Sequence, residues 1–236
     1  MPSLQGRLAL VTGASRGIGA AVARRFATEG AHVIAIARTQ GALEELDDAV
    51  RASGGAATLV PLDLREFDAI DHMGAALYER FGKLDVVVGC AGVLGNLSPV
   101  GHIDPKLWRE VFDINVTANY RLIRSLDPLL RQSGSGRAIF VTCAAVREMA
   151  PFWGAYGASK AALETLVRIY AAEVARTPLR VNLVDPGPVR TRLRAEAFPA
   201  EDRDVLKAPE EVTEVFVRLA AADCPHHGEI VDAQSS

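Results

Sequence analysis

Short apolar runs alternate along the chain with longer stretches in which apolar residues recur every three or four positions. The runs predict buried strands, and the longer stretches predict helices with one buried face. The predicted strands are residues 8–11, 32–37, 57–61, 84–88, 138–142, 179–184 and 229–231. The predicted helices are residues 20–29, 43–52, 67–81, 108–131, 156–175 and 210–221.

This alternation predicts a parallel sheet, because strands that are apolar throughout must be buried on both faces. Right-handed crossovers then give an α/β, doubly wound Rossmann-type fold with about seven strands and helices on both faces. A chain of 236 residues, of which 49% are hydrophobic, is long enough for one sizeable core. We therefore expect a single domain over residues 1–236.

Net charge indicates the kind of partner to expect, and cysteine content indicates the compartment. The formal net charge of −3 and the pI of about 6.0 give no broad attraction to nucleic acid or to an anionic membrane, so a small-molecule partner fits better. Cys90, Cys143 and Cys224 are far apart and lack CxxC spacing, as is typical of a reducing compartment. The first apolar run is too short for a signal or membrane helix. We expect a cytoplasmic protein without a metal site, since His226-His227 lacks a third ligand.

A glycine-rich turn directly follows the first predicted strand and opens the next helix, with the sequence Thr12-Gly13-Ala14-Ser15-Arg16-Gly17-Ile18-Gly19. Glycines allow the backbone to approach a pyrophosphate, whose charge lies against the N–H groups at the helix N-terminus. A turn without a ligand is the alternative, but its place on the first βα turn favours a dinucleotide site. The predicted cofactor-binding residues are Gly13, Ser15, Arg16, Gly17, Ile18 and Gly19.

The end of the second predicted strand indicates which nicotinamide cofactor is bound. An NAD site usually has Asp or Glu there, which accepts hydrogen bonds from the ribose 2′-hydroxyl, whereas this chain has Ala37. Arg38 follows, and Arg16 lies in the glycine turn, so two guanidinium groups are available to a 2′-phosphate. Two solvated surface arginines are the alternative. The missing acid and the two cations favour NADP or NADPH over NAD.

Further motifs follow the glycine turn, whose spacing is Gly-x-x-x-Gly-x-Gly. Tyr156-Gly157-Ala158-Ser159-Lys160 is a Tyr-x-x-x-Lys motif, Asn115 lies in a predicted helix, and Pro186-Gly187 follows the sixth strand. In this order, these motifs resemble the short-chain dehydrogenase/reductase family. Within it, residues 153–156 and 197–202 are similar to a bacterial subgroup, the YciK-like oxidoreductases.

The resemblance implies an NADP(H)-dependent oxidoreductase that interconverts a carbonyl and an alcohol by hydride transfer, with Tyr156 as acid/base. It implies that Asp63 and Leu64 contact the adenine, a surface carboxylate being the alternative, and that a segment of about residues 187–208 covers the substrate. Family members commonly form homodimers or homotetramers through the helices that correspond to residues 108–131 and 156–175. The further cofactor-binding residues that it implies are Cys90, Ala91, Gly92, Tyr156, Lys160, Pro186, Gly187, Val189 and Thr191.

Tyr156 and Lys160 are four residues apart in a predicted helix, so both side chains project from one face. A tyrosine with the usual pKa of about 10 is a poor base near neutral pH. Lys160 and the positive ring of the oxidised cofactor are expected to lower the pKa of Tyr156. By resemblance, Asn115 holds a water linked to Lys160. The alternatives are a surface Tyr–Lys pair and an ordinary polar helix residue.

Two cysteines depart from the family pattern. Cys143 stands where the family has a serine that polarises the substrate oxygen, and a thiol is a weaker donor than a hydroxyl. Neighbouring Thr142 faces the opposite side unless the strand end twists. Cys143 thus acts in the serine's role, belongs to a site adapted to an unusual substrate, or leaves a site that binds cofactor but turns over slowly. Cys90 replaces an asparagine, and the two cysteines form either a redox-sensitive pair or two buried thiols.

Residues near the substrate region leave further alternatives. Arg190, Arg192 and Arg194 either attract an acidic substrate or form a solvated charge run. Phe152 and Trp153 either line the pocket or pack against the start of the helix. The alternative function is a catalytically weak or inactive NADP-binding sensor or scaffold, because Cys143 replaces the usual serine.

Overall fold

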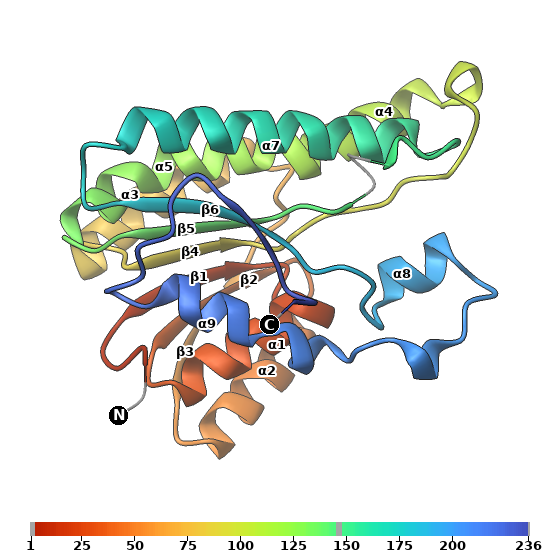
Figure 1. Cartoon of the computed structure of the whole chain (residues 1–236). Coiled ribbons are helices and arrows are strands. Elements are labelled where there is room, and N and C mark those ends of the chain that lie inside the picture. Colours follow the sequence, from red (N-terminus) through yellow and green to blue (C-terminus); the bar gives the residue numbers. More distant parts are fainter. Residues whose placement is uncertain (1–2, 145–147, 236) are drawn as a thin grey trace.

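A parallel sheet of seven strands forms the centre of the molecule, in the order β3-β2-β1-β4-β5-β6-β7 (Figure 1). The computed structural model describes residues 3–144 and 148–235. Every neighbouring pair of strands is parallel, so the predicted doubly wound parallel sheet is confirmed. The strands are β1 (Leu8–Thr12), β2 (His32–Ala37), β3 (Ala56–Pro61), β4 (Val86–Gly89), β5 (Arg137–Val141), β6 (Arg180–Asp185) and β7 (Ile230–Asp232).

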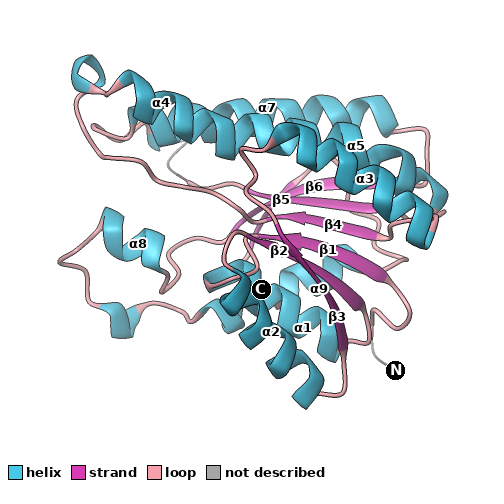
Figure 2. Cartoon of the chain, turned by 180° about the vertical axis from the view of Figure 1, so that it is seen from behind, coloured by secondary structure: helices cyan, strands magenta, loops and turns pink. Residues whose placement is uncertain are grey.

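Helices cover both faces of the sheet (Figures 1 and 2). One face carries α1 (Gly17–Thr28), α2 (Gln40–Ala52) and α9 (Glu214–Ala220). The other carries α3 (Phe67–Phe81), α4 (Pro105–Phe112), α5 (Ala118–Gln132) and α7 (Gly154–Val174). Within the described ranges, no helix is both long and apolar enough to span a membrane.

Each face of the sheet has its own apolar core, because successive side chains of a strand point to opposite faces. In β1, Val11 packs in the cluster that contains Phe26 of α1 and Phe216 of α9. Leu10, its neighbour in the chain, packs in the cluster that contains Leu122 of α5. Burial on both sides explains why the strands are apolar at nearly every position.

The order of the strands creates a crevice at one edge of the sheet. β1 pairs with β2 on one side and with β4 on the other, so the connections after these strands lead to opposite sides. Ligands of open α/β sheets bind at the carboxyl ends of the strands where the order reverses in this way. The loops after β1 and β4 therefore border the expected site.

The predicted helix over residues 108–131 consists of three segments. Asp104 caps the first, because its carboxylate accepts hydrogen bonds at 2.7 and 3.1 Å from the N–H groups two and three residues later. A π-helical turn, η2 (Asp113–Thr117), then separates α4 from α5. Asn115 lies in this turn, and such turns are rare and frequently mark functional sites.

The segment after β6 contains a helix that the hydrophobic pattern did not predict. In α8 (Arg192–Ala197), the hydroxyl of Thr191 accepts a hydrogen bond from the N–H of Arg194 at 3.2 Å. The helix is short and rich in charge, so it has no recognisable apolar period. The described chain also contains the 3-10 turns η1 (Val100–His102), η3 (Arg203–Val205) and η4 (Pro209–Val212), the last of which begins the region predicted as helix 210–221.

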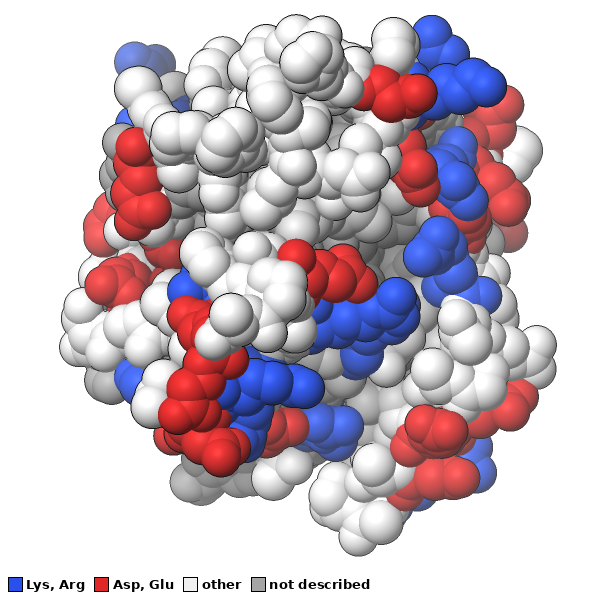
Figure 3. Space-filling model, turned by 90° about the vertical axis from the view of Figure 1, so that its right-hand side faces the viewer, with Lys and Arg blue, Asp and Glu red and all other residues white. Residues whose placement is uncertain are grey.

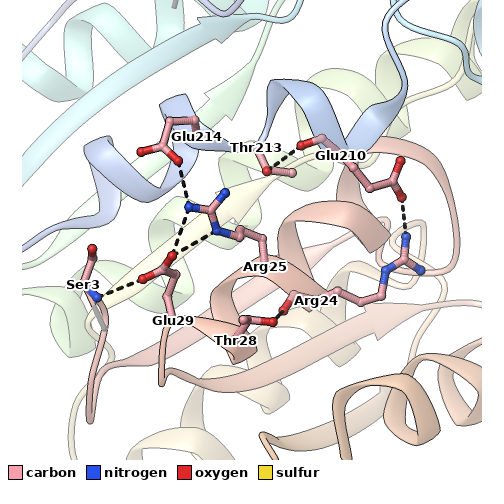
Figure 4. Close-up of polar contacts among 8 residues, drawn as sticks. All are labelled: Ser3, Arg24, Arg25, Thr28, Glu29, Glu210, Thr213 and Glu214. Carbon is pink, nitrogen blue, oxygen red and sulfur yellow. Dashed lines mark hydrogen bonds and ion pairs between the residues drawn. The ribbon is translucent and has the colours of Figure 1, made fainter. Parts of the chain in front are cut away.

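Charged side chains fasten η4 and α9 to α1 (Figure 4). Arg24 pairs with Glu210 at 2.7 Å. Arg25 pairs with Glu214 at 2.7 Å and with Glu29 at 3.0 Å. Exposed pairs contribute only about 0–1 kcal/mol each. Their effect is to fix the place where the chain returns from α8 relative to α1, whose start carries the glycine turn.

Candidate active site

A cleft of about 1030 Å³ opens at the carboxyl ends of the strands. Figure 3 faces this end of the molecule, and Lys and Arg side chains gather around its middle. Asn115 is fully buried behind the cleft. The cleft brings together the other site residues predicted from the sequence, which are Gly13, Ser15, Arg16, Gly17, Ile18, Gly19, Arg38, Asp63, Leu64, Cys90, Ala91, Gly92, Cys143, Tyr156, Lys160, Pro186, Gly187, Val189 and Thr191.

The glycine turn brings the start of α1 close to the backbone around it. Gly13 has a φ of +66°, which favours glycine, and a Cβ there would lie 3.0 Å from the Cα of Ala91. A Cβ on Gly19 would overlap with the carbonyl oxygen of Gly13. In the described chain, no side chain caps the first turn of α1, which follows Arg16. A helix N-terminus that faces a cleft without a side-chain cap suits a phosphate group.

Arg16 and Arg38 border the cleft from the loops after β1 and β2, which are neighbouring strands. Both side chains are exposed. Among the described residues, no carboxylate lies within ion-pair distance of either guanidinium. Ala37, which ends β2, is almost fully buried and carries no polar side chain. Two available cations thus stand where an NAD site has an acid.

Asp63 and Leu64 follow β3 and line the same cleft. Arg65 donates hydrogen bonds to both carboxylate oxygens of Asp63, at distances of 2.6 and 3.1 Å. These hydrogen bonds hold the pKa of Asp63 below its ordinary value. The carboxylate is therefore ionised and fixed in place, and Arg65, which no sequence motif indicated, is the residue that fixes it.

Tyr156 and Lys160 lie on one face of α7, and both are buried. Lys160 Nζ lies 5.7 Å from the centre of the Tyr156 ring and donates a hydrogen bond to the carbonyl of Val141 at 2.9 Å. Burial and the neighbouring Cys143 side chain raise the pKa of Tyr156 well above its usual value, and burial lowers the pKa of Lys160. In the chain by itself, desolvation thus raises the pKa of Tyr156, while its lowering by Lys160 together with the oxidised cofactor stays a prediction for the complex.

Cys143 and Thr142 face opposite directions at the end of β5. The Cys143 side chain lines the cleft and forms a hydrogen bond with that of Tyr156. The Thr142 hydroxyl donates instead to the carboxylate of buried Glu164 at 2.5 Å. The strand end does not twist enough to bring the Thr142 hydroxyl to Tyr156. Of these two neighbours, Cys143 is therefore the one that meets Tyr156 in the cleft.

Asn115 is held between the loop after β4 and α7. Its Oδ1 accepts the N–H of Val93 at 2.9 Å, and its Nδ2 donates to the carbonyl of Val93 at 3.0 Å. Nδ2 also donates to the hydroxyl of Ser159 at 2.9 Å. A Cβ on Gly92 would lie 3.3 Å from Asn115 Oδ1 and 3.5 Å from Lys160 Nζ. The absence of a side chain at Gly92 thus leaves the space between the amide and the ammonium group open.

Cys90 directly follows β4 and lies beside the glycine turn. The N–H groups of Cys90 and Ala91 donate to the hydroxyl of Thr12 at 3.1 and 3.2 Å. Thr12, which the sequence motifs did not mark as a site residue, therefore ties the two strand ends together. Burial raises the pKa of Cys90 to about 12, and no disulfide joins any of the described cysteines. A half-buried thiol that stays protonated reacts slowly, which disfavours a redox-sensitive pair.

The two histidines near the C-terminus are engaged in structural contacts. His226 Nδ1 lies 2.8 Å from the carboxylate of Glu229. His227 Nε2 lies 2.9 Å from the carbonyl of Ala171, and its Nδ1 accepts the N–H of Val181. Across residues 3–144 and 148–235, no group of three metal-ligating side chains is placed to hold a metal ion.

Comparison with known proteins places this arrangement in a family. The sequence model described as short chain dehydrogenase matches residues 7–202. The chain belongs to the short-chain dehydrogenase family. It is similar to the uncharacterized oxidoreductase YciK of Escherichia coli (strain K12), at 34% identity over 93% of this chain and 88% of that protein. It is also similar to the 2,3-dihydro-2,3-dihydroxybenzoate dehydrogenase of Bacillus subtilis (strain 168), at 30% identity over 98% of this chain and 88% of that protein.

Solved structures of this dehydrogenase family share the whole fold. YciK from E. coli superposes with a TM-score of 0.95 at 34% identity, covering 99% of this chain and 98% of that chain. A short chain dehydrogenase from Shigella flexneri 2a complexed with NADP gives a TM-score of 0.95 at 34% identity, covering 99% and 100%. One from E. coli CFT073 complexed with NADPH gives 0.93 at 34% identity, covering 99% of both chains. The predicted resemblance to the YciK-like subgroup is confirmed.

In this dehydrogenase, a residue near the C-terminus holds the Pro-Gly loop after β6. Gly187 has a φ of +63°, and its N–H donates to Asp185 Oδ1 at 3.1 Å. Gln234 Nε2 donates to the carbonyl of Pro186 at 2.6 Å, and Lys207 Nζ donates to the carbonyl of Gln234 at 3.3 Å. No local motif marks Gln234, which lies 48 residues from the loop in sequence, so only the fold identifies it.

Proposed function

We propose that this short-chain dehydrogenase is an NADP(H)-dependent oxidoreductase that interconverts a carbonyl and an alcohol, with Tyr156 as the acid/base. One observation carries the proposal: Tyr156, Lys160 and Cys143 meet in the same cleft that the glycine turn borders. A proton donor, a neighbouring cation and a phosphate-binding turn in one cleft are the parts that this chemistry requires.

The residues of the cleft fit a dinucleotide. The cradle at Gly13, Gly19 and Gly92 is a backbone surface that a Cβ would partly fill, and it suits the pyrophosphate and ribose groups. Arg16 and Arg38 would hold the 2′-phosphate. The complexes of two relatives with NADP and NADPH support this choice of cofactor.

Other lining residues would hold the two bases of the cofactor. Asp63 and Leu64 would contact the adenine, while the loop after β6 would frame the nicotinamide. We include in this frame the residues Pro186, Gly187, Val189 and Thr191. We assign the segment of residues 187–208, which contains α8, to covering the substrate.

The chain's own contribution to the reaction is the movement of a proton. NADPH, when bound, supplies the hydride. During reduction Tyr156 Oη donates its proton to the substrate oxygen, and during alcohol oxidation it accepts that proton. The raised pKa keeps Tyr156 protonated at neutral pH, which is the form required for reduction.

Three neighbours prepare Tyr156 for this step. Lys160, held by the carbonyl of Val141, places a cation beside the phenol and favours the phenolate that forms as the proton leaves. Asn115 lies next to Lys160 across Gly92 and would hold a water that returns protons from solvent. The Cys143 thiol would donate a weak hydrogen bond to the substrate oxygen.

A screen of aldehydes, ketones and alcohols with NADPH and NADH tests the proposal. In the variant Tyr156→Phe we expect turnover to fall by about 1,000-fold or more, since the proton donor is lost, while NADPH binding followed by fluorescence stays within twofold. Turnover that survives in Tyr156→Phe contradicts the assignment of the acid/base.

A cofactor-binding protein with little turnover is the second candidate, and Cys143 is the observation that favours it. A thiol polarises an oxygen less than a hydroxyl does, so the barrier to hydride transfer is higher. Tight NADPH binding without turnover of any carbonyl or alcohol in the screen would support this candidate over the first.

We also propose that the chain forms a homodimer or homotetramer through α5 and α7. Tyr120 on α5 is 47% exposed and Ile169 on α7 is 53% exposed, which leaves apolar surface on both helices. Light scattering should give a mass of two or four chains, and Tyr120→Glu with Ile169→Glu should reduce it to one.

A further inference from the structure

The outer half of the cleft, beyond Tyr156, is surrounded by apolar side chains. They come from both sides of the cleft: the loop after β4 and the end of β5 on one side, and α8 on the other. An apolar surface beside a polar group such as the Tyr156 hydroxyl is suited to an apolar ligand whose reacting oxygen is placed at that group. The members of this apolar cluster are Leu94, Leu97, Cys143, Trp153, Tyr156, Leu193 and Ala197.

Two aromatic side chains continue this surface outward from Tyr156. The centre of the Trp153 ring lies 5.8 Å from that of Tyr156, in an edge contact, and 5.6 Å from that of Phe198. Trp153 immediately precedes α7 and Phe198 immediately follows α8, so the two rings meet from opposite sides of the cleft, which both line. Their ring surfaces offer a large contact area at low conformational cost.

Two further apolar side chains close to Trp153 in the fold or the chain are exposed. Phe152 is 56% exposed and Val100 is 73% exposed. Val100 lies beside Gly154, the residue after Trp153, because its Cγ2 would be 3.1 Å from a Cβ on Gly154. Figure 3 shows mostly uncharged side chains over the upper part of this face. Apolar groups exposed next to a cleft gain free energy when a ligand covers them.

The arginines of this region already have acidic partners. Both oxygens of Glu201 accept hydrogen bonds from Arg194, whose Cζ lies 3.8 Å from the ring centre of Phe198. An anionic ligand would compete with these carboxylates for the guanidinium groups, and the carboxylate of Glu148 at the cleft would repel it. The three pairs are Arg190 with Asp204 at 4.0 Å, Arg192 with Glu196 at 2.7 Å and Arg194 with Glu201 at 2.5 Å.

We infer that the substrate is an uncharged carbonyl compound or alcohol with a bulky apolar body, which packs on Trp153 and Phe198 while its oxygen reaches Tyr156. This inference rests on the proposed carbonyl–alcohol reaction. It runs against the acidic substrate that the arginine run suggested in the sequence. The arginines instead hold α8 and the segment after it in position.

Three aldehydes of nearly the same shape test the charge preference in the full chain with NADPH. They are 4-tert-butylbenzaldehyde, 4-carboxybenzaldehyde and 4-formyl-N,N,N-trimethylanilinium, which are neutral, anionic and cationic. We expect kcat/KM for the neutral aldehyde to exceed both others by about 30-fold or more, because the apolar wall cannot solvate a charge. Equal or higher values for either charged aldehyde overturn the inference.

Substitutions locate the preference in the aromatic wall. Trp153→Ala should lower kcat/KM for 4-tert-butylbenzaldehyde about tenfold and that for propanal less than twofold, because propanal is too small to reach the wall. Trp108→Ala removes a tryptophan that is 40% exposed on α4 outside the cleft lining and should change neither value. Equal losses for both aldehydes in Trp153→Ala would show that Trp153 acts only by supporting Tyr156 and would contradict its role as substrate wall.

A gain of binding checks the role of the ion pairs. Glu201→Gln releases Arg194, so kcat/KM for 4-carboxybenzaldehyde should rise about fivefold while that for the neutral aldehyde stays constant. A value for the anionic aldehyde that does not rise would contradict the statement that pairing is what excludes acids.

Binding separates a failure of this inference from a failure of the proposed function. Calorimetry with the three corresponding benzyl alcohols, on the protein with NADP added, measures the charge preference without turnover. Preferred binding of the neutral alcohol in the absence of turnover would refute the proposed reaction and leave the substrate class standing. Equal binding of all three, or no binding of any, would refute the substrate class whether or not aldehydes are reduced.

Discussion

The two halves of the cleft differ in whether backbone or side chains form their surface. The half that borders the glycine turn is made of backbone, and its shape depends on the lack of side chains at Gly13, Gly19 and Gly92. The half around Tyr156 is made of side chains whose positions depend on one another, such as Lys160.

The difference explains where this chain departs from its family. A backbone surface changes little when a side chain pointing away from it changes, so the glycine turn keeps the family pattern. A cluster of side chains can exchange one member while the others keep their places. By the family resemblance, Cys143 is such an exchange, since it still meets Tyr156, whereas Cys90 lies beside the glycine turn, where Thr12 binds its backbone N–H.

The backbone half should be the more sensitive to added volume. Gly19→Ala places a Cβ against the carbonyl of Gly13, and we expect the Kd for NADPH, measured by fluorescence titration, to rise about 100-fold. Gly41→Ala is the matched control, because a Cβ there meets nothing within 4 Å, and it should leave the Kd unchanged. Similar Kd values for both variants would mean that the turn is not the phosphate site.

The charge at the edge of the backbone half should decide the cofactor. Arg38→Asp should raise the KM for NADPH about 30-fold and leave the KM for NADH within threefold, since only NADPH carries the 2′-phosphate. The exposed Arg176, outside the cleft lining, provides the control Arg176→Asp. An equal rise in the KM for NADH and for NADPH would contradict the assignment of Arg38 to the 2′-phosphate.

The side-chain half should respond to the restoration of the family's serine. Cys143→Ser should raise kcat for a simple aldehyde about tenfold, because a hydroxyl donates a stronger hydrogen bond to the substrate oxygen. Steady-state kinetics with saturating NADPH measure it. An unchanged or lower kcat would show that the site is adapted to its thiol.

We expect the smallest effect on cofactor binding from Gln234, which supports the Pro-Gly loop after β6. Gln234→Ala removes the hydrogen bond to the carbonyl of Pro186, worth about 1 kcal/mol, so the KM for NADPH should rise about fivefold. The melting temperature should shift little, since Gln234 is only partly buried. Ser235→Ala, next in the chain, should leave the KM unchanged, and a matching rise in it would assign the effect to the whole terminus.

The sequence by itself determined the fold and the place of the cofactor site. Buried strands and amphipathic helices have local periods, so all seven strands and four of the helices could be predicted with errors of only a few residues, as for the strand 32–37 and the helix 67–81. The glycine turn could also be predicted from the sequence, because its function depends on residues that are adjacent in the chain. The spacing from Tyr156 likewise marks Cys143 as the main departure from the pattern that the family resemblance implies.

Only the tertiary structure decided which side chains meet and in what protonation state. The π-helical turn at Asn115, the hydrogen bond from Gln234 and the pairing of Arg194 with Glu201 all depend on packing that no local pattern encodes. The raised pKa of Tyr156 follows from burial, which exists only once distant segments close over the helix. Local periodicity specifies elements, whereas desolvation and side-chain pairing arise from contacts between residues far apart in the chain.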